Sequence, residues 1–267
     1  MKHDLIIRGG KLVTANETYT ADIGIKDGRI ATLGEDLDGN DIINADKKLV
    51  MPGGIEAHCH IAQESANGIM TSDDYETGSI SAAFGGNSCF VPFAAQKKGE
   101  SIASTIAEYD RRAETKSVID YSYHLILTDP NENVMNELPS AFERGITSFK
   151  VFMTYATRVS DAQFLDILTI ARRHGGLTMV HAENHDMLSW MSNALTQAGY
   201  TEPRYHAPAR PSLAEEEAIN RAISLSKLAN APLMIVHVST PKGAELVARA
   251  RMDGAFVFGE TCPQYLF

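Results

Sequence analysis

From residue 52 onward, short apolar runs rich in β-branched residues alternate with longer segments of helical periodicity. Such alternation is typical of βα units, in which each helix returns the chain to the same edge of a parallel sheet. It predicts an α/β domain built on parallel strands. The predicted strands are residues 53–59, 87–93, 119–127, 147–153, 177–182, 232–238 and 255–260.

Three predicted helices of this region begin with a capping-box pattern, a polar residue followed three positions later by Glu or Gln. The pairs are Asp73 with Glu76, Ser160 with Gln163, and Ser212 with Glu215. The last of these helices also opens with the acidic run Glu215-Glu216-Glu217, which the helix dipole favours at an N-terminus without any further function.

Residues 1–51 follow a different pattern, with short segments of alternating polarity. In Lys26-Asp27-Gly28-Arg29 the Asp-Gly pair is the signature of a type I′ hairpin turn. We therefore expect a small antiparallel β unit over residues 1–51 and a separate α/β domain over residues 52–267.

Polar side chains lie at or near the ends of several predicted strands. His58 and His60 close the first strand, His181 and His237 close two later ones, and Lys150 lies within SFKVFM. Active sites of parallel barrels are built at the carboxyl ends of the strands, and residues i and i+2 of a strand point to the same face. The set predicts a two-metal centre with these five residues as ligands.

Lys150 has apolar residues on both sides, which is a poor setting for a solvated ammonium group. Burial disfavours the charged form and lowers the pKa of a lysine. A neutral amine can react with CO2 to form a carbamate, an anionic group whose two oxygens can bridge two cations. The alternative is a structural lysine whose ammonium group meets an acidic partner.

The segments around these residues resemble the dihydropyrimidinase/hydantoinase family of cyclic amide hydrolases, within the amidohydrolase superfamily. The resemblance extends along the whole chain and rests on PGGIEAHCH (52–60), TSDDYETGSISAAFGG (71–86), SFKVFMTY (148–155), VHAEN (180–184), VHVST (236–240) and ETCPQYL (260–266). Cys59, His185 and the pair Asn87-Ser88 depart from the residues usual at those positions, and we expect Cys59 to face away from the metals.

The resemblance implies a (β/α)8 TIM-type barrel, of which this chain carries about seven strands, and part of a small N-terminal β-sandwich. Family members are longer, and their last metal ligand is an aspartate at the end of the eighth strand. We therefore expect that strand and its aspartate to lie beyond Phe267. The resemblance also implies assembly as a homotetramer.

For the chemistry, the resemblance implies two divalent metal ions per subunit, zinc in view of the imidazole ligands, and a carbamate formed from CO2 on Lys150. A hydroxide bridging the metals attacks the ring amide and yields an N-carbamoyl amino acid. The family assigns Tyr155 a hydrogen bond to the substrate and its developing oxyanion. From the sequence alone, packing on the barrel rim explains Tyr155 equally well.

Ala62 stands where an arginine would suggest a carboxylated substrate, as in dihydroorotase, so neutral dihydropyrimidines or 5-substituted hydantoins are expected. We expect the loop 61–72, Phe93 and Phe152 to shape the pocket for the 5-substituent. Two alternatives remain. One is another cyclic amidase such as allantoinase, and the other is a non-catalytic assembly paralogue, which the presence of all five candidate ligands disfavours.

Composition fits a cytoplasmic enzyme that acts on a small molecule. The 267 residues carry a net charge of −10, which argues against nucleic acid or an anionic membrane as a partner. The three cysteines lack CxxC spacing and predict neither a disulfide framework nor a thiolate zinc site. No apolar run has the length of a signal peptide core or a membrane span. Two further histidines, His124 and His206, are expected to have structural roles in the core and in a loop.

Overall fold

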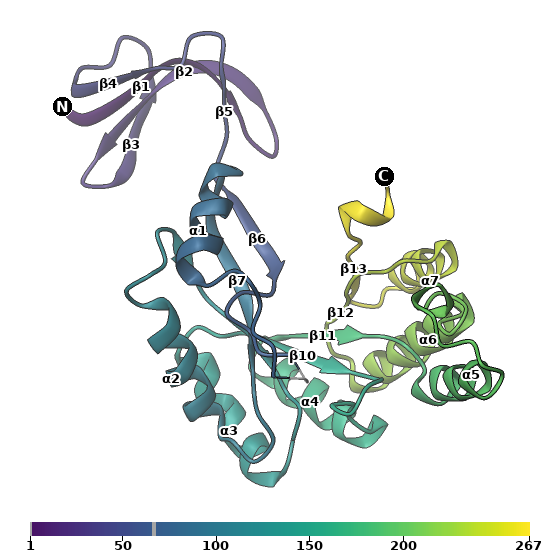
Figure 1. Cartoon of the computed structure of the whole chain (residues 1–267). Coiled ribbons are helices and arrows are strands. Elements are labelled where there is room, and N and C mark those ends of the chain that lie inside the picture. The colour runs from purple at the N-terminus through teal and green to yellow at the C-terminus, as the bar shows by residue number, and fades with distance from the viewer. Residues whose placement is uncertain (1, 66–67) are drawn as a thin grey trace. The chain divides into compact units, whose positions relative to one another are not determined.

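The computed structural model describes residues 2–65 and 68–267, and the chain divides into two compact units between Gly54 and Ile55. The first unit is a five-stranded sheet in the order β3-β2-β1-β4, with β5 also beside β1 (Figure 1). Its strands are β1 (His3–Val13), β2 (Thr18–Lys26), β3 (Arg29–Gly34), β4 (Gly39–Asn44) and β5 (Leu49–Val50).

The hairpin between β2 and β3 forms as predicted, because Asp27 and Gly28 both have positive φ, 50° and 71°. The prediction of a purely antiparallel unit is wrong, because β4 and β5 run parallel to β1. The segment after β3 does not turn back on that strand. It is anchored to the strands β1 and β2 instead, since Leu37 donates its backbone N–H to Asp22 and accepts from Arg8.

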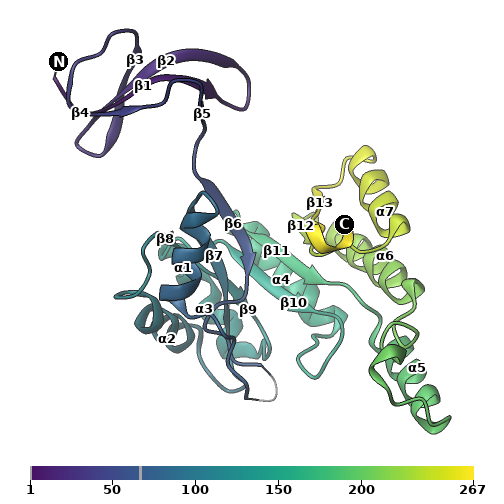
Figure 2. The same ribbon diagram turned by 45° about the horizontal axis from the view of Figure 1, so that its top comes forward.

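The second unit is built on a parallel sheet in the order β13-β12-β11-β10-β9-β7-β6, with β8 beside β7 (Figures 1 and 2). Seven strands form the continuous path of this sheet, as predicted. Its strands are β6 (Gly54–Cys59), β7 (Asn87–Ala95), β8 (Asp120–Tyr121), β9 (His124–Ile126), β10 (Ser148–Phe152), β11 (Leu177–His181), β12 (Leu233–Ile235) and β13 (Val257–Gly259). The predicted strand 119–127 is divided into β8 and β9.

In the described residues, seven helices connect these strands, which gives the βα alternation of a TIM-type barrel. They are α1 (Tyr75–Phe84), α2 (Ile102–Ala113), α3 (Glu132–Glu143), α4 (Asp161–Arg173), α5 (His185–Gln197), α6 (Ser212–Ala229) and α7 (Pro241–Met252). Two short 3-10 turns, η1 (Pro203–Tyr205) and η2 (Pro263–Tyr265), lie in loops.

The parallel sheet is strongly curled. Strands β6 and β13 are its two ends, six strand spacings apart, which corresponds to about 29 Å in a flat sheet. Yet the imidazole of His58 on β6 lies 2.6 Å from the carboxylate of Glu260, the residue that follows β13. The curl therefore gathers the carboxyl ends of the strands around one small region.

The central strands of the sheet are buried on both faces, whereas β6 and β13 at its ends are partly exposed. The larger apolar core packs between the sheet and the helices, and Cys59 contacts this core on the helix side. A smaller cluster, formed by Phe93, Ile126, Met179 and Val236, fills the concave face. Lys150 pairs in register with Ile126 and Met179, which places its side chain on the concave face with that cluster.

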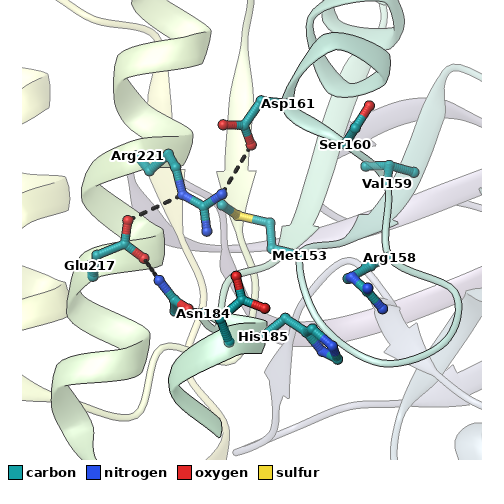
Figure 3. A pocket seen from close by; sticks show the side chains of 10 residues that line it. Met153, Arg158, Val159, Ser160, Asp161, Asn184, His185, Glu217 and Arg221 are labelled. Carbon is teal, nitrogen blue, oxygen red and sulfur yellow. Dashed lines mark hydrogen bonds and ion pairs between the residues drawn. The ribbon is translucent and has the colours of Figure 1, made fainter. Parts of the chain in front are cut away.

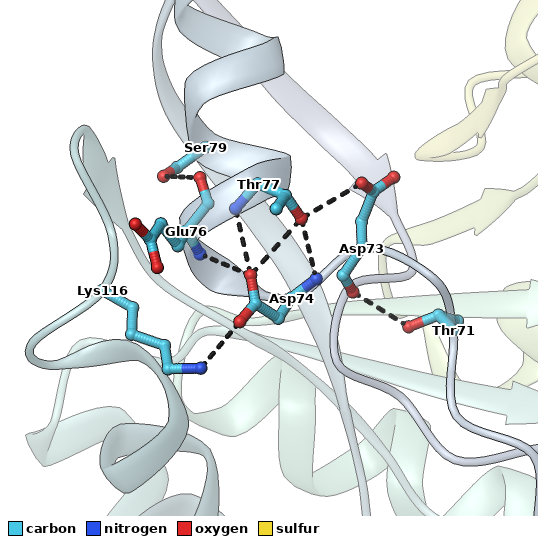
Figure 4. A network of polar contacts seen from close by, with 7 residues as sticks. All are labelled: Thr71, Asp73, Asp74, Glu76, Thr77, Ser79 and Lys116. Carbon is cyan, nitrogen blue, oxygen red and sulfur yellow. Dashed lines mark hydrogen bonds and ion pairs between the residues drawn. The ribbon is translucent and has the colours of Figure 1, made fainter.

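The helix starts are partly as predicted. Ser160 and Gln163 form the expected capping box of α4. At α1 the box is one residue later than predicted, because Asp74 rather than Asp73 is the N-cap and pairs with Thr77 (Figure 4). At α6 the predicted box is absent, since Pro211 is the N-cap and no side chain caps the helix.

All three cysteines, Cys59, Cys89 and Cys262, are free, as expected. Among the described helices, none combines the length and the apolar character needed to cross a membrane.

Candidate active site

The curled sheet brings the predicted ligand residues together. The ring centroids of His58 and His60 lie 5.5 Å apart, those of His58 and His237 5.8 Å, and those of His181 and His237 4.7 Å. Phe93 links Lys150 to this group, because the lysine Nζ lies 5.2 Å from the centroid of its ring. The same ring lies 4.8 Å from His58 and 4.9 Å from His60.

Lys150 is the least exposed charged residue of the site, with 2% of its surface accessible. Burial lowers its pKa from 10.5 to about 7. Across residues 2–65 and 68–267, its amine has no hydrogen bond and no carboxylate within ion-pair distance. The charge of Glu260 opposes this shift but burial outweighs it, so a structural ion pair is not formed among these residues and a substantial fraction of the amine is neutral near pH 7.

Hydrogen bonds fix the tautomers of His58 and His60. The Nδ1 atom of His58 lies 2.6 Å from a carboxylate oxygen of Glu260, and the Nδ1 atom of His60 lies 2.6 Å from the amide oxygen of Gln63. Both oxygens are acceptors, so each Nδ1 carries the proton. In the neutral ring the Nε2 atom then keeps its lone pair free to bind a cation.

The same reasoning applies to His181, with the ring nitrogens exchanged. Its Nε2 atom donates to Glu183 over 2.6 Å, so its Nδ1 atom keeps the lone pair, 3.1 Å from Nε2 of His237. Burial alone would raise the pKa of Glu183, but hydrogen bonds from His181 and Arg210 outweigh it and hold that pKa at about 2. Burial lowers the pKa of His237 to about 3, so this ring is neutral.

These donors fit a centre for divalent cations. Neutral imidazoles with one oriented nitrogen suit zinc, and a carboxylate behind the imidazole is the usual partner of a metal-bound histidine. Within the described part of the chain, no three His, Cys, Asp or Glu side chains converge on one point.

Three residues with strained backbone conformations follow strands that carry or precede the candidate site residues. Ala62, Tyr155 and His237 have positive φ values of 48°, 69° and 42°, and they follow β6, β10 and β12 respectively. Non-glycine residues rarely adopt this conformation, and it persists where the surrounding structure enforces it, often at functional sites. The loops after these three strands are thus held in specific conformations.

Tyr155 lies beside a cavity of about 230 Å³ that His181 and His237 also line. Its ring centroid is 5.1 Å from that of His181, and the guanidinium carbon of Arg210 lies 5.4 Å from it. Burial raises the pKa of Tyr155 despite the opposing effect of Arg210, so its hydroxyl is a proton donor at neutral pH. His206, expected to pack within its loop, lines this cavity instead.

The predicted pocket residues have different environments. Phe93 has no exposed surface, so it packs beneath His58 and His60 and does not meet a bound molecule directly. Phe152 lies 6.0 Å from Tyr155 between ring centroids and is partly accessible. Of the loop 61–72, residues 66 and 67 lie outside the described residues.

His124 has the structural role that its sequence position indicated. Its Nδ1 atom lies 2.5 Å from the hydroxyl of Ser148, and its Nε2 atom lies 2.9 Å from the carbonyl oxygen of Ala57. It thereby ties β9 to β6 and β10 on the concave face.

Sequence reasoning missed three charged residues of the site, Glu183, Arg210 and Glu260. Glu183 follows His181 by two positions, and Glu260 is the final residue of the last predicted strand, so their positions at strand ends could have identified both. Arg210 lies in a loop without periodicity. Its guanidinium donates to Glu183 over 2.5 Å, and no sequence pattern indicates that contact.

A larger hollow of about 460 Å³ lies beside this site, between the loops after β10 and β11 and the helix α6 (Figure 3). It contains none of the five candidate ligands. Several of its charged residues neutralise one another, since Arg221 pairs with Asp161 and Glu217. The smaller cavity with the histidines is therefore the candidate active site.

Comparison with known proteins gives the following matches. No protein-family model matches the chain. The D-hydantoinase of Geobacillus stearothermophilus is 42% identical over 266 residues, which cover 98% of this chain and 56% of that protein. The dihydropyrimidinase of Rattus norvegicus is 35% identical over 266 residues, which cover 96% and 51%. The crystal structure of dihydropyrimidinase from Brevibacillus agri matches with a TM-score of 0.94 and 43% identity, covering 100% of this chain and 58% of that one. The chain spans little more than half the length of these relatives.

Proposed function

This chain belongs to the hydantoinase and dihydropyrimidinase family, and on that basis we propose that the protein hydrolyses the cyclic amide bond of dihydropyrimidines or 5-substituted hydantoins. Water adds across the ring C–N bond, the ring opens, and the product is an N-carbamoyl amino acid. Its two named relatives act on rings of these two classes, as their names state.

The observation that carries the proposal is the setting of Lys150. A buried lysine with a pKa of about 7 and no carboxylate within ion-pair distance among the described residues is an unusual amine, and it lies on the concave face close to oriented imidazoles. Strongly perturbed lysines in such places are more often functional than structural. Reaction with CO2 would form an N–C bond, release one proton and place an anionic carbamate there.

We propose that His58, His60, His181, His237 and this carbamate hold two divalent cations, with zinc favoured by the imidazoles. Bound cations of this kind polarise a carbonyl and bring the pKa of water close to neutrality. The protein itself supplies the orientation. Glu260 keeps the proton on Nδ1 of His58, and Glu183 keeps it on Nε2 of His181, so that the opposite nitrogen of each ring keeps its lone pair for a cation.

Tyr155 is the proposed substrate contact. Because its hydroxyl keeps its proton at neutral pH, it can donate to the amide oxygen as negative charge develops there. Arg210 lies against the ring of Tyr155 and donates to Glu183, which in turn binds His181. A single guanidinium group therefore anchors both the Tyr155 hydroxyl and the His181 imidazole. The partly exposed ring of Phe152 beside Tyr155 is the proposed neighbour of the 5-substituent.

Substrate assays test this proposal. The protein is incubated with zinc and bicarbonate and then assayed in parallel on dihydrouracil, a 5-substituted hydantoin and allantoin. Turnover of the first two above that of allantoin supports the proposal, whereas a preference for allantoin assigns the protein to another class of cyclic amidase. Loss of all activity in Lys150→Ala excludes a contaminating hydrolase. Binding of metal without turnover of any ring would favour a non-catalytic assembly role.

Two further expectations rest on the resemblance and composition alone. They are a homotetrameric assembly and a cytoplasmic location, which sedimentation analysis and cell fractionation would measure.

A further inference from the structure

The acidic run at the start of α6 does more than complement the helix dipole. Glu215 accepts hydrogen bonds from the backbone N–H groups of Ser239 and Thr240, each over 3.0 Å, and from both of their hydroxyl groups. Thr240 is the N-cap of α7. One carboxylate therefore binds the loop between β12 and α7, which carries His237.

That loop contains strained backbone. His237 has a φ of 42° and lies two residues before Ser239. Between them, Val238 donates to the carbonyl of Glu260 over 2.6 Å and accepts from the hydroxyl of Thr261. A strained residue persists only where its surroundings over-determine it. The backbone N–H of His237 itself donates to the Glu260 carboxylate over 3.4 Å. Removal of Glu215 would release one of the groups of contacts that hold this loop.

Glu217 binds the neighbouring loop in the same way. Asn184 donates its side-chain amide to Glu217 over 2.6 Å (Figure 3). Its backbone N–H donates to the carbonyl of Ala214 over 2.9 Å. Asn184 is the N-cap of α5 and follows His181 by three residues. Arg221 orients Glu217 from one turn further along α6.

The spacing on α6 explains why two glutamates serve two loops. Residues two apart on a helix are separated by about 200° around its axis. Glu215 and Glu217 therefore reach in different directions, one toward α7 and the other toward α5. Glu216 lies between them, and in the described part of the chain its side chain makes no hydrogen bond or ion pair.

We propose that Glu215 and Glu217 are positioning residues. From the first turns of α6 they hold the loops of His237 and His181, and so keep the two imidazoles at their observed separation and orientation. This inference rests on the proposed function, because it treats the two imidazoles as metal ligands. Both glutamates act through backbone and side-chain contacts of the loops and neither touches the reacting atoms.

Three alanine variants test this proposal, Glu215→Ala, Glu217→Ala and the matched control Glu216→Ala. Zinc affinity is measured by competition with a chelator at a temperature well below the unfolding transition of each variant. We expect zinc to bind about 10–100-fold more weakly in the first two variants, the usual effect of losing a group that supports a metal ligand. The control should match the wild type. Equal affinity in all three would overturn the proposal, even if unfolding temperatures differ.

A second readout does not depend on metal. Crystal structures of the metal-free proteins should show the rings of His181 and His237 displaced from their separation of 4.7 Å in the Glu215→Ala variant, and unchanged in the control. If the wild type binds no zinc, the proposed function fails, and this readout still decides the positioning role. Glu215→Gln keeps an acceptor oxygen and should give an intermediate displacement. An undisturbed ring pair in Glu215→Ala would refute the proposal.

Discussion

Replacing Lys150 by methionine should stabilise the metal-free protein, although it removes the residue on which the proposed chemistry depends. Methionine is unbranched and of similar length, so it can occupy the same buried space. The substitution removes the free-energy cost of burying an amine. Its pKa falls from 10.5 to about 7 in the folded protein, so folding must displace a proton that the unfolded chain retains.

The size of this effect follows from the pKa difference. The interval is about 3.5 units, and each unit corresponds to about 1.4 kcal/mol. At pH 7, where the folded amine is half protonated, burial therefore costs about 4 kcal/mol, and at pH 9 it costs about 2 kcal/mol. The sign follows from proton binding. Between pH 7 and 10.5 the unfolded chain binds more protons than the folded one, so the stability of the wild type rises with pH.

Denaturant unfolding at pH 7 and pH 9 measures this difference, in CO2-free buffer with a chelator so that no carbamate forms. The advantage of Lys150→Met over the wild type should shrink by about 2 kcal/mol between the two pH values. Any change in packing cancels in that comparison. Lys98→Met, at an exposed position, should show no such dependence. A difference that is the same at both pH values would refute the buried neutral amine.

Three other substitutions test single contacts of the site. Tyr155→Phe should lower kcat by about 10²–10³-fold and leave the metal content unchanged, as expected for one lost oxyanion donor; an unchanged kcat would assign Tyr155 to packing. Arg210→Gln should destabilise the protein by about 1–3 kcal/mol in denaturant unfolding, because it removes a charged partner of the half-buried Glu183. The matched variant Arg204→Gln breaks an exposed pair and should change stability by less than about 1 kcal/mol. Burial lowers the pKa of His124 to about 4, so stability is lost as pH falls from 6.5 toward 4, and His124→Asn should lose less over that interval than the wild type.

The sequence indicated the strands and their polar ends because those features are local. Apolar, β-branched runs specify parallel strands buried on both faces, and the apolar neighbours of Lys150 already indicated its burial. Helix starts were less certain for a local reason. Asp73 and Asp74 stand side by side, each followed three positions later by a residue that can complete a capping box, and backbone geometry selected Asp74 with Thr77.

Contacts between distant segments could not be predicted in this way. The bond between His58 and Glu260 joins residues 202 positions apart, and it forms only because the curl of the sheet brings the carboxyl ends of its two end strands close to each other. Glu215 could be assigned to helix capping from the sequence, yet its carboxylate binds the loop after β12 instead. Such partners are set by which strand ends become neighbours, and that depends on the whole sheet.

The proposed function depends above all on Lys150, whose amine is proposed to carry a carbamate group that helps to hold two metal ions. Its most direct test combines elemental analysis with a crystal structure of the protein loaded with zinc and bicarbonate. We predict two zinc ions per chain, continuous density for a carboxylated Lys150 between them, and loss of both metals in Lys150→Ala. An active wild type with an unmodified Lys150, or a Lys150→Ala variant that keeps both metals and full activity, would contradict it.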